Sequence, residues 1–215
     1  MKTLQLASNF KRITILILMS ILLSSFNLDL FAQKCKPDIL TVDKISKKKF
    51  TAWMGELFET SSGAVIIGGA TSTLQVTLII GSEQDANFIQ LLIKKSESSK
   101  QNAAAEAQLK GSKGNEFMLG LKDGEPLNFS ATAVLNNSKI TMGDLVTTIS
   151  YGAYIPNEQL SSTIESLTTK SIDAFRIKFD NDVVIEKSVK EKNGEKMKNK
   201  ASCFESFLKE NGRLK

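Results

Sequence analysis

The residue types that carry most hydrolytic and metal chemistry are scarce in this chain. It contains no histidine and only two cysteines, Cys35 and Cys203. Without histidine there is no Ser-His-Asp or Cys-His arrangement and no imidazole ligand for a metal. A zinc site needs about four ligands drawn from Cys, His and carboxylate, so we expect neither a zinc site nor a cofactor. The composition leans against an enzyme without deciding the question.

Pairs of carboxylates are the remaining route to catalysis, because two acids can hydrolyse a glycosidic bond. Glu56 with Glu59 and Asp180 with Asp182 are the candidate pairs. Their polar contexts favour solvated surface acids, and spacing along the chain does not establish separation in space. Asp180 and Asp182 are also weak candidates for Ca²⁺, since they supply oxygen ligands. Their segment lacks the glycine and the distal glutamate of a full calcium loop, so a turn between strands is the preferred interpretation.

Amphipathic aromatic residues are the candidate ligand contacts. The Trp and Tyr residues of the chain are Trp53, Tyr151 and Tyr154. Each offers a flat apolar surface with a polar group, although in a sheet protein such side chains more often pack in the core. Arg176 adds a charged side chain of the type suited to bidentate contacts. We name these four residues as possible contacts to a ligand.

The first 32 residues have the layout of a secretory signal peptide. A basic start is followed by the apolar run ITILILMSILL, residues 13–23. This run is shorter than the roughly 20 residues that a membrane-spanning helix needs. Ala32 places a small residue before a plausible cleavage point. We therefore expect an exported protein, periplasmic or secreted, whose mature chain begins at Gln33 and keeps no integral membrane segment.

The expected export bears on the state of the two cysteines and on the net charge of the mature chain. An oxidising compartment favours a disulfide, so we predict the pair Cys35–Cys203. Lys34 precedes Cys35 and does not suit lipoprotein processing, so a lipid anchor is not expected. The net charge of +5 includes +2 from residues 1–32, which leaves +3 for residues 33–215. That modest charge does not form the basic footprint of a nucleic-acid binder.

Apolar residues alternate along much of residues 33–215, which predicts a single strand-rich domain. Asp123-Gly124 predicts a hairpin turn. The uncharged stretch 60–82 is rich in β-branched residues and glycine, which favours strands over a membrane helix. Strands are predicted at residues 50–58, 64–67, 73–80, 87–95, 117–121, 127–133, 144–155 and 172–179.

Two helices are predicted late in the chain. Pro156-Asn157 suits the start of a helix over residues 157–167. A second helix is predicted at about 195–211, after Gly194, which would weaken an earlier start; its apolar stripe consists of Met197, Ala201, Phe204 and Leu208. Many strands with one short helix and a C-terminal helix predict an α+β fold with a predominantly antiparallel β-sheet, sandwich or open-barrel-like.

The sequence favours a non-enzymatic binding or envelope-interaction domain, with an unknown protein or glycan as its partner. The motivation is a strand-rich exported chain without a catalytic constellation. One alternative is a carboxylate-dependent hydrolase of envelope or extracellular polysaccharide. Another is a structural or adhesion subunit that assembles through its sheet edges by strand addition.

Overall fold

A computed structural model describes residues 35–42, 47–60, 72–84, 86–98, 109–141, 144–180 and 182–214. The predicted signal peptide, residues 1–32, and the predicted strand at 64–67 lie outside the described residues. Pro37–Lys215 form one compact unit. Both described sheets and both described helices belong to the Pro37–Lys215 unit.

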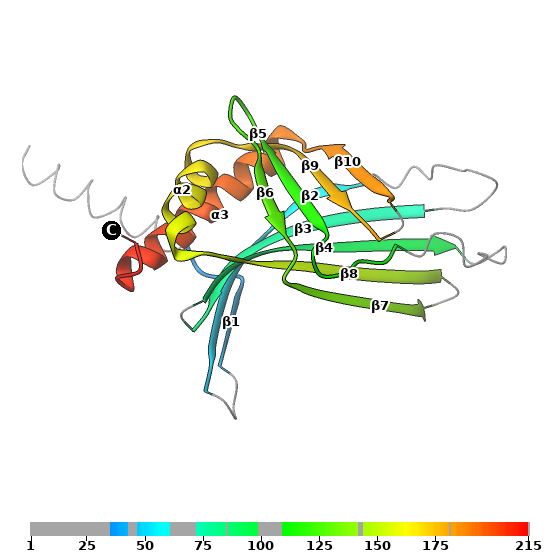
Figure 1. The fold of residues 1–215 in the computed structure, drawn as a ribbon, viewed down its shortest axis with the longest axis horizontal. Coiled ribbons are helices and arrows are strands. Elements are labelled where there is room, and N and C mark those ends of the chain that lie inside the picture. The colour runs from blue at the N-terminus through cyan, green and yellow to red at the C-terminus, as the bar shows by residue number, and fades with distance from the viewer. Residues whose placement is uncertain are drawn as a thin grey trace, which may run out of the picture. The chain divides into compact units, whose positions relative to one another are not determined.

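A six-stranded antiparallel sheet is the main element of this unit, in the order β1-β2-β3-β4-β8-β7. Figure 1 shows that its long strands curl into a half-barrel. The register between β2 and β3 shifts between Glu56 and Phe58, and such a bulge adds bend and twist to a strand. The strands are β1 (Ile39–Val42), β2 (Lys49–Glu59), β3 (Ser72–Glu83), β4 (Ala86–Ser98), β7 (Ala133–Thr141) and β8 (Asp144–Ile155).

A smaller sheet has the order β10-β9-β5-β6. Its strands are β5 (Glu116–Leu121), β6 (Leu127–Ser130), β9 (Ile172–Lys178) and β10 (Val184–Ser188). The predicted hairpin forms between β5 and β6, and Asp123 has the positive φ of 56° that such a turn uses.

The prediction of one continuous strand over 127–133 is wrong. The chain leaves the smaller sheet after Ser130 and enters the six-stranded sheet at Ala133. The backbone bonds give the reason. The Ala131 N–H donates to the Asn115 carbonyl beside β5, whereas the Thr132 N–H donates to the Gly152 carbonyl of β8.

The two described helices are α2 (Asn157–Thr169) and α3 (Glu191–Glu210). The predicted apolar stripe of α3 is confirmed as buried, from Met197 to Leu208. However, α3 begins before the predicted residue 195, because Gly194 packs directly on the carbonyl of Ile172 in β9, where a Cβ atom would collide. Neither described helix is long and apolar enough to cross a membrane.

The core lies against one face of the six-stranded sheet, which we call the inner face. On this face Trp53 packs against Phe204 and Phe207 of α3, each with ring centroids 5.5 Å apart. Tyr151 meets Phe179, just beyond β9, edge-on at 5.8 Å. The opposite side of the same sheet is the outer face. The predicted α+β class with a mainly antiparallel sheet is confirmed.

Candidate functional site on the outer sheet face

Part of the outer face of the six-stranded sheet is apolar, although Glu56, Gln75 and Lys94 also lie on this face. Successive side chains of a strand point to opposite faces, so Phe50, Ala52 and Met54 of β2 lie opposite the side that carries Trp53. Residues directly paired across an antiparallel sheet share a face. Phe88 of β4 pairs with both Gly81 and Tyr154. These residues therefore build one surface across four strands.

Aromatic rings dominate this surface. Phe50 and Phe88 stack with ring centroids 5.2 Å apart and an interplanar angle of 24°. Phe88 lies over Gly81, where a Cβ atom would come within 2.8 Å of the ring, so glycine is needed for this close approach. Tyr154 is 53% exposed. The rings rest on a small apolar cluster that comprises Ala52, Ile79 and Phe88, flanked by Ile39, Phe50, Met54 and Leu92.

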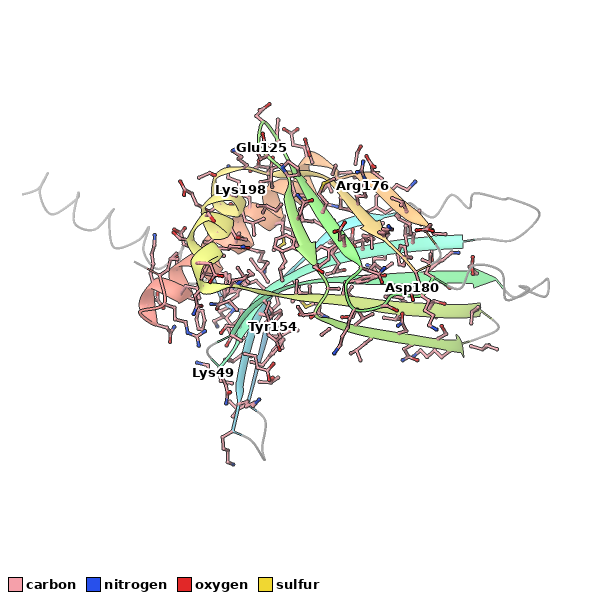
Figure 2. All side chains as sticks on the ribbon, in the orientation of Figure 1. Lys49, Glu125, Tyr154, Arg176, Asp180 and Lys198 are labelled. Carbon is pink, nitrogen blue, oxygen red and sulfur yellow. The ribbon has the colours of Figure 1, made fainter. Side chains whose placement is uncertain are left out.

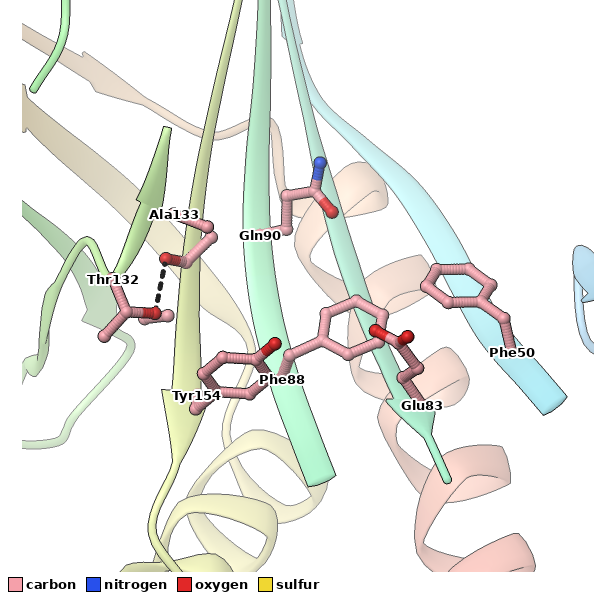
Figure 3. Close-up of a pocket in the computed structure, with 9 residues that line it drawn as sticks. Phe50, Glu83, Phe88, Gln90, Thr132, Ala133 and Tyr154 are labelled. Atoms are coloured by element: carbon pink, nitrogen blue, oxygen red, sulfur yellow. Dashed lines mark hydrogen bonds between the residues drawn. The ribbon is translucent and has the colours of Figure 1, made fainter. Parts of the chain in front are cut away.

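A hollow of about 130 Å³ opens among these residues (Figure 3). In this view the two helices lie behind the strands, which confirms that the hollow is on the outer face. Gly152 of β8 contributes space, because a Cβ atom there would meet nothing nearer than the Ala133 carbonyl oxygen at 3.6 Å. The hollow is lined by Phe50, Glu83, Phe88, Gln90, Thr132, Ala133, Gly152, Ala153 and Tyr154.

Polar side chains lie beside the rings. Gln90 occupies β4 in the row that pairs with Gly152, and its Nε2 donates a hydrogen bond to Ser150 Oγ. Thr132 Oγ1 donates to the Gly152 carbonyl at 3.2 Å. Glu83 is half-buried and lies 3.9 Å from the ammonium of Lys48. The hollow therefore combines flat apolar surfaces with hydrogen-bonding groups at its margin.

The aromatic residues singled out from the sequence occupy different environments. Tyr154 lines the hollow, whereas Trp53 and Tyr151 are fully buried on the inner face. Tyr151 Oη donates to the Lys178 carbonyl at 3.3 Å. Burial raises the pKa of Tyr151 above its ordinary value, and the carboxylate of Asp180 raises it further. Of these three aromatic residues, only Tyr154 is exposed to a ligand.

Arg176 lies on the other sheet, away from Tyr154 (Figure 2). Its Nε donates to Glu186 Oε2 of β10 at 2.7 Å. It lines a wide surface depression of about 440 Å³ on the smaller sheet, together with Lys178 and Asp182. Charges of both signs border this depression, so nothing there selects one class of ligand.

Three of the four carboxylates singled out from the sequence, all except Glu59, have ordinary partners. Asp180 accepts a hydrogen bond from Ser112 Oγ at 2.7 Å. Asp182 has a positive φ of 56°, as the predicted turn requires, and lies 3.7 Å from Lys178 Nζ. Glu56 accepts a hydrogen bond from Gln75 Nε2 at 3.1 Å. Within the part of the chain that the structure describes, no group of three or more His, Cys, Asp or Glu could hold a metal ion.

Cys35 and Cys203 are both disulfide-bonded, and the chain has no other cysteine. Cys203 is buried in α3. The bond restricts the unfolded chain over most of its length, and restricting so long a loop stabilises a fold by up to about 5 kcal/mol in the chain-entropy model.

Sequence reasoning missed Phe50, Phe88 and Gln90 as parts of a site. The signal was present, because Phe88 and Leu92 alternate with Ile89, Leu91 and Ile93, so this part of β4 carries apolar side chains on both faces. A strand of this kind usually needs cover on both sides. Comparison with protein-family models, curated proteins and solved structures finds no match for this chain. The function must therefore be argued from the outer face itself.

Proposed function

We propose that the chain is an exported binding domain that takes one sugar ring of a glycan in the outer-face hollow. The observation that carries this proposal is the placement of Tyr154 and the Phe50–Phe88 stack around the same hollow as Gln90 and Glu83. A sugar ring presents an apolar C–H face and a rim of hydroxyl groups. Aromatic rings can pack on the face, while amide and carboxylate groups bond the hydroxyls.

The size of the hollow supports a single ring as the bound group. Its volume of about 130 Å³ is well below the roughly 300–1,000 Å³ of pockets that enclose a drug-sized ligand. A shallow site of this size on a sheet suits one residue of a longer polymer that continues over the surface. The exposed position of Tyr154 leaves one ring free to pack on that residue.

Export agrees with the chemistry of the chain. A disulfide is stable in the periplasm or outside the cell, where glycans are also abundant. Together with the predicted signal peptide, the disulfide supports the proposal that the binding activity belongs to the cell envelope or the extracellular medium.

Binding is favoured over hydrolysis by the number of acids at the hollow. Glycoside hydrolysis usually requires two carboxyl groups that flank the scissile bond. Glu83 is the one carboxylate among the described residues that line the hollow. A single acid can hold a hydroxyl group but cannot supply both an acid and a nucleophile or base.

The test is a glycan array probed with the mature chain, followed by NMR titration of the disulfide-intact protein with the best-binding oligosaccharide. Tyr154→Ala removes the exposed ring. Gly152→Val adds a side chain at the floor of the hollow, where a Cβ atom would make only ordinary van der Waals contacts with Ala133. Val184→Ser is the matched control, because Val184 is also about half exposed but belongs to β10 of the other sheet.

We expect both outer-face variants to weaken binding at least about tenfold, as loss of one aromatic contact commonly does, while Val184→Ser binds normally. The NMR chemical-shift changes on binding should be largest for residues of β4 and β8. An array without any bound glycan would overturn the proposal, and so would binding that both outer-face variants retain. Release of reducing ends from the bound glycan would instead favour the hydrolase.

A further inference from the structure

The edges of the two sheets differ in how well they are protected. The most exposed large apolar side chains among the described residues, Leu135 at 73% and Ile140 at 75%, both lie in β7, an edge strand of the six-stranded sheet (Figure 1). β7 has 9 residues and pairs with β8 without any register shift. Its other side has no strand partner in either described sheet, so alternate residues direct N–H and C=O groups away from β8.

The other three edges carry the features that usually prevent sheet-to-sheet association. β1 and β6 have 4 residues each and begin close behind Pro37 and Pro126. β10 has 5 residues, two of them charged. Short edge strands, prolines and charges are common protective devices, and β7 has none of these except Lys139. Its long, regular, apolar edge is the kind that accepts another strand.

We propose that two copies of this chain associate by antiparallel pairing of their β7 strands, which joins the two six-stranded sheets into one continuous sheet. This inference goes beyond ligand binding and does not depend on it. A two-fold axis at Asn137 pairs all 9 residues of the strand with their counterparts. The two residues of each pair then have numbers that are both even or both odd. They therefore lie on the same face of their sheets, and the joined sheet keeps one outer face, as an antiparallel sheet requires.

The sequence of β7 is complementary to itself in this register. Leu135 stands opposite Lys139 of the second copy on the outer face, where the lysine stem can cover the leucine. Ile140 stands opposite Val134 on the inner face. The two copies of Lys139 are four residues apart along the strands, about 14 Å, and at physiological salt that distance is screened. No like charges oppose each other, and both of the most exposed apolar residues become covered.

The test measures the mass of the mature, disulfide-intact chain by analytical ultracentrifugation from micromolar to millimolar concentration. Leu135→Glu and Leu135→Lys change the same exposed position with opposite sign. In the proposed register, residue 135 of each copy stands opposite Lys139 of the other copy. The dimer of Leu135→Glu therefore contains two attractive Glu–Lys pairs, and the dimer of Leu135→Lys contains two repulsive Lys–Lys pairs. We expect a wild-type dimer, a dimer retained by Leu135→Glu, and a dissociation constant at least about tenfold higher for Leu135→Lys than for Leu135→Glu.

A cysteine at the axis tests the register directly. Residues directly opposite in an antiparallel pair have Cβ atoms about 4.5–5.5 Å apart, close enough for a disulfide after small adjustment. Asn137→Cys should therefore cross-link the dimer under mild oxidation, whereas Leu135→Cys should not. A strict monomer would overturn the proposal, as would equal effects of the two Leu135 charges or cross-linking at position 135 in place of 137.

Discussion

Tyr151 and Tyr154 are close together on β8, yet they lie on opposite faces of the sheet and differ in their burial and in what surrounds each ring. Tyr151 is fully buried on the inner face, and its hydroxyl group is bonded to the Lys178 carbonyl. Tyr154 is 53% exposed on the outer face and lines a hollow. The inner ring joins the two sheets, whereas the outer ring is available to a ligand. Residue type alone therefore does not separate a core residue from a binding residue in this chain.

The difference arises from what covers each face. Both faces carry aromatic and aliphatic side chains, and the inner face packs against α3 and the smaller sheet. On the outer face the described residues form a thin cluster around Phe88, with Phe50 lying on it. Apolar surface in a sheet protein stabilises the fold only as far as it is removed from water. The inner face should therefore control stability and the outer face should control binding.

Truncating the large rings provides the strongest test of this comparison. Trp53→Ala should lower the free energy of unfolding by about 3–5 kcal/mol, because it leaves a cavity between β2 and α3. Phe50→Ala, on the same strand but the other face, should cost about 1–2 kcal/mol, since Phe50 is only partly buried. Urea denaturation followed by circular dichroism measures both values. Equal losses would mean that the outer face is part of the core.

Adding a methyl group to a glycine sharpens the same contrast. Gly194→Ala should destabilise the protein by about 1–3 kcal/mol through overpacking against the Ile172 carbonyl. This is notable because alanine is the better helix former by about 1 kcal/mol. Gly152→Ala, which points into the outer hollow, should be neutral or stabilising by up to about 1 kcal/mol. Thermal denaturation of the two variants gives the signs, and a stabilised Gly194→Ala would contradict the close packing of α3 on β9.

The smallest change in stability at neutral pH is expected from removing the hydroxyl group of Tyr151. Tyr151→Phe should cost about 1 kcal/mol through the lost hydrogen bond. Its raised pKa adds a dependence on alkaline pH, since above about pH 10 the unfolded chain releases the phenolic proton while the folded protein keeps it. The contribution of Tyr151 should therefore be constant below about pH 10 and fall by up to about 1.4 kcal/mol per pH unit above it. Tyr151→Phe should lose that part of the slope.

Tyr154→Phe is the control for this titration, because it removes an exposed hydroxyl group from the same strand and leaves the buried Tyr151 in place. An alkaline slope that Tyr151→Phe shares with the wild type would show that the buried hydroxyl group ionises in the folded protein.

The elements that the sequence predicts well are those whose pattern is local. The α3 stripe from Met197 to Leu208 follows helical spacing, and the Asp123-Gly124 turn depends on only two residues. β7 was missed because the run AVLNNSKIT has too few apolar residues to alternate clearly. Tyr154 was a candidate from its residue type. Its partners Phe50, Phe88 and Gln90 come from β2 and β4, and only the strand order brings them to the same surface.

The segment that connects β6 to β7 has a consequence for how the two sheets unfold. Ala131 is held on the side of the smaller sheet, where its N–H donates to Asn115 and its carbonyl accepts from Gly114, at 2.9 and 2.8 Å. The next residue, Thr132, donates its N–H to Gly152 in the other sheet at 2.8 Å. Because these adjacent amides are bonded toward different sheets, separation of one sheet alone should release one amide proton and leave the other protected. Clearly unequal exchange rates would therefore indicate that the two sheets open separately.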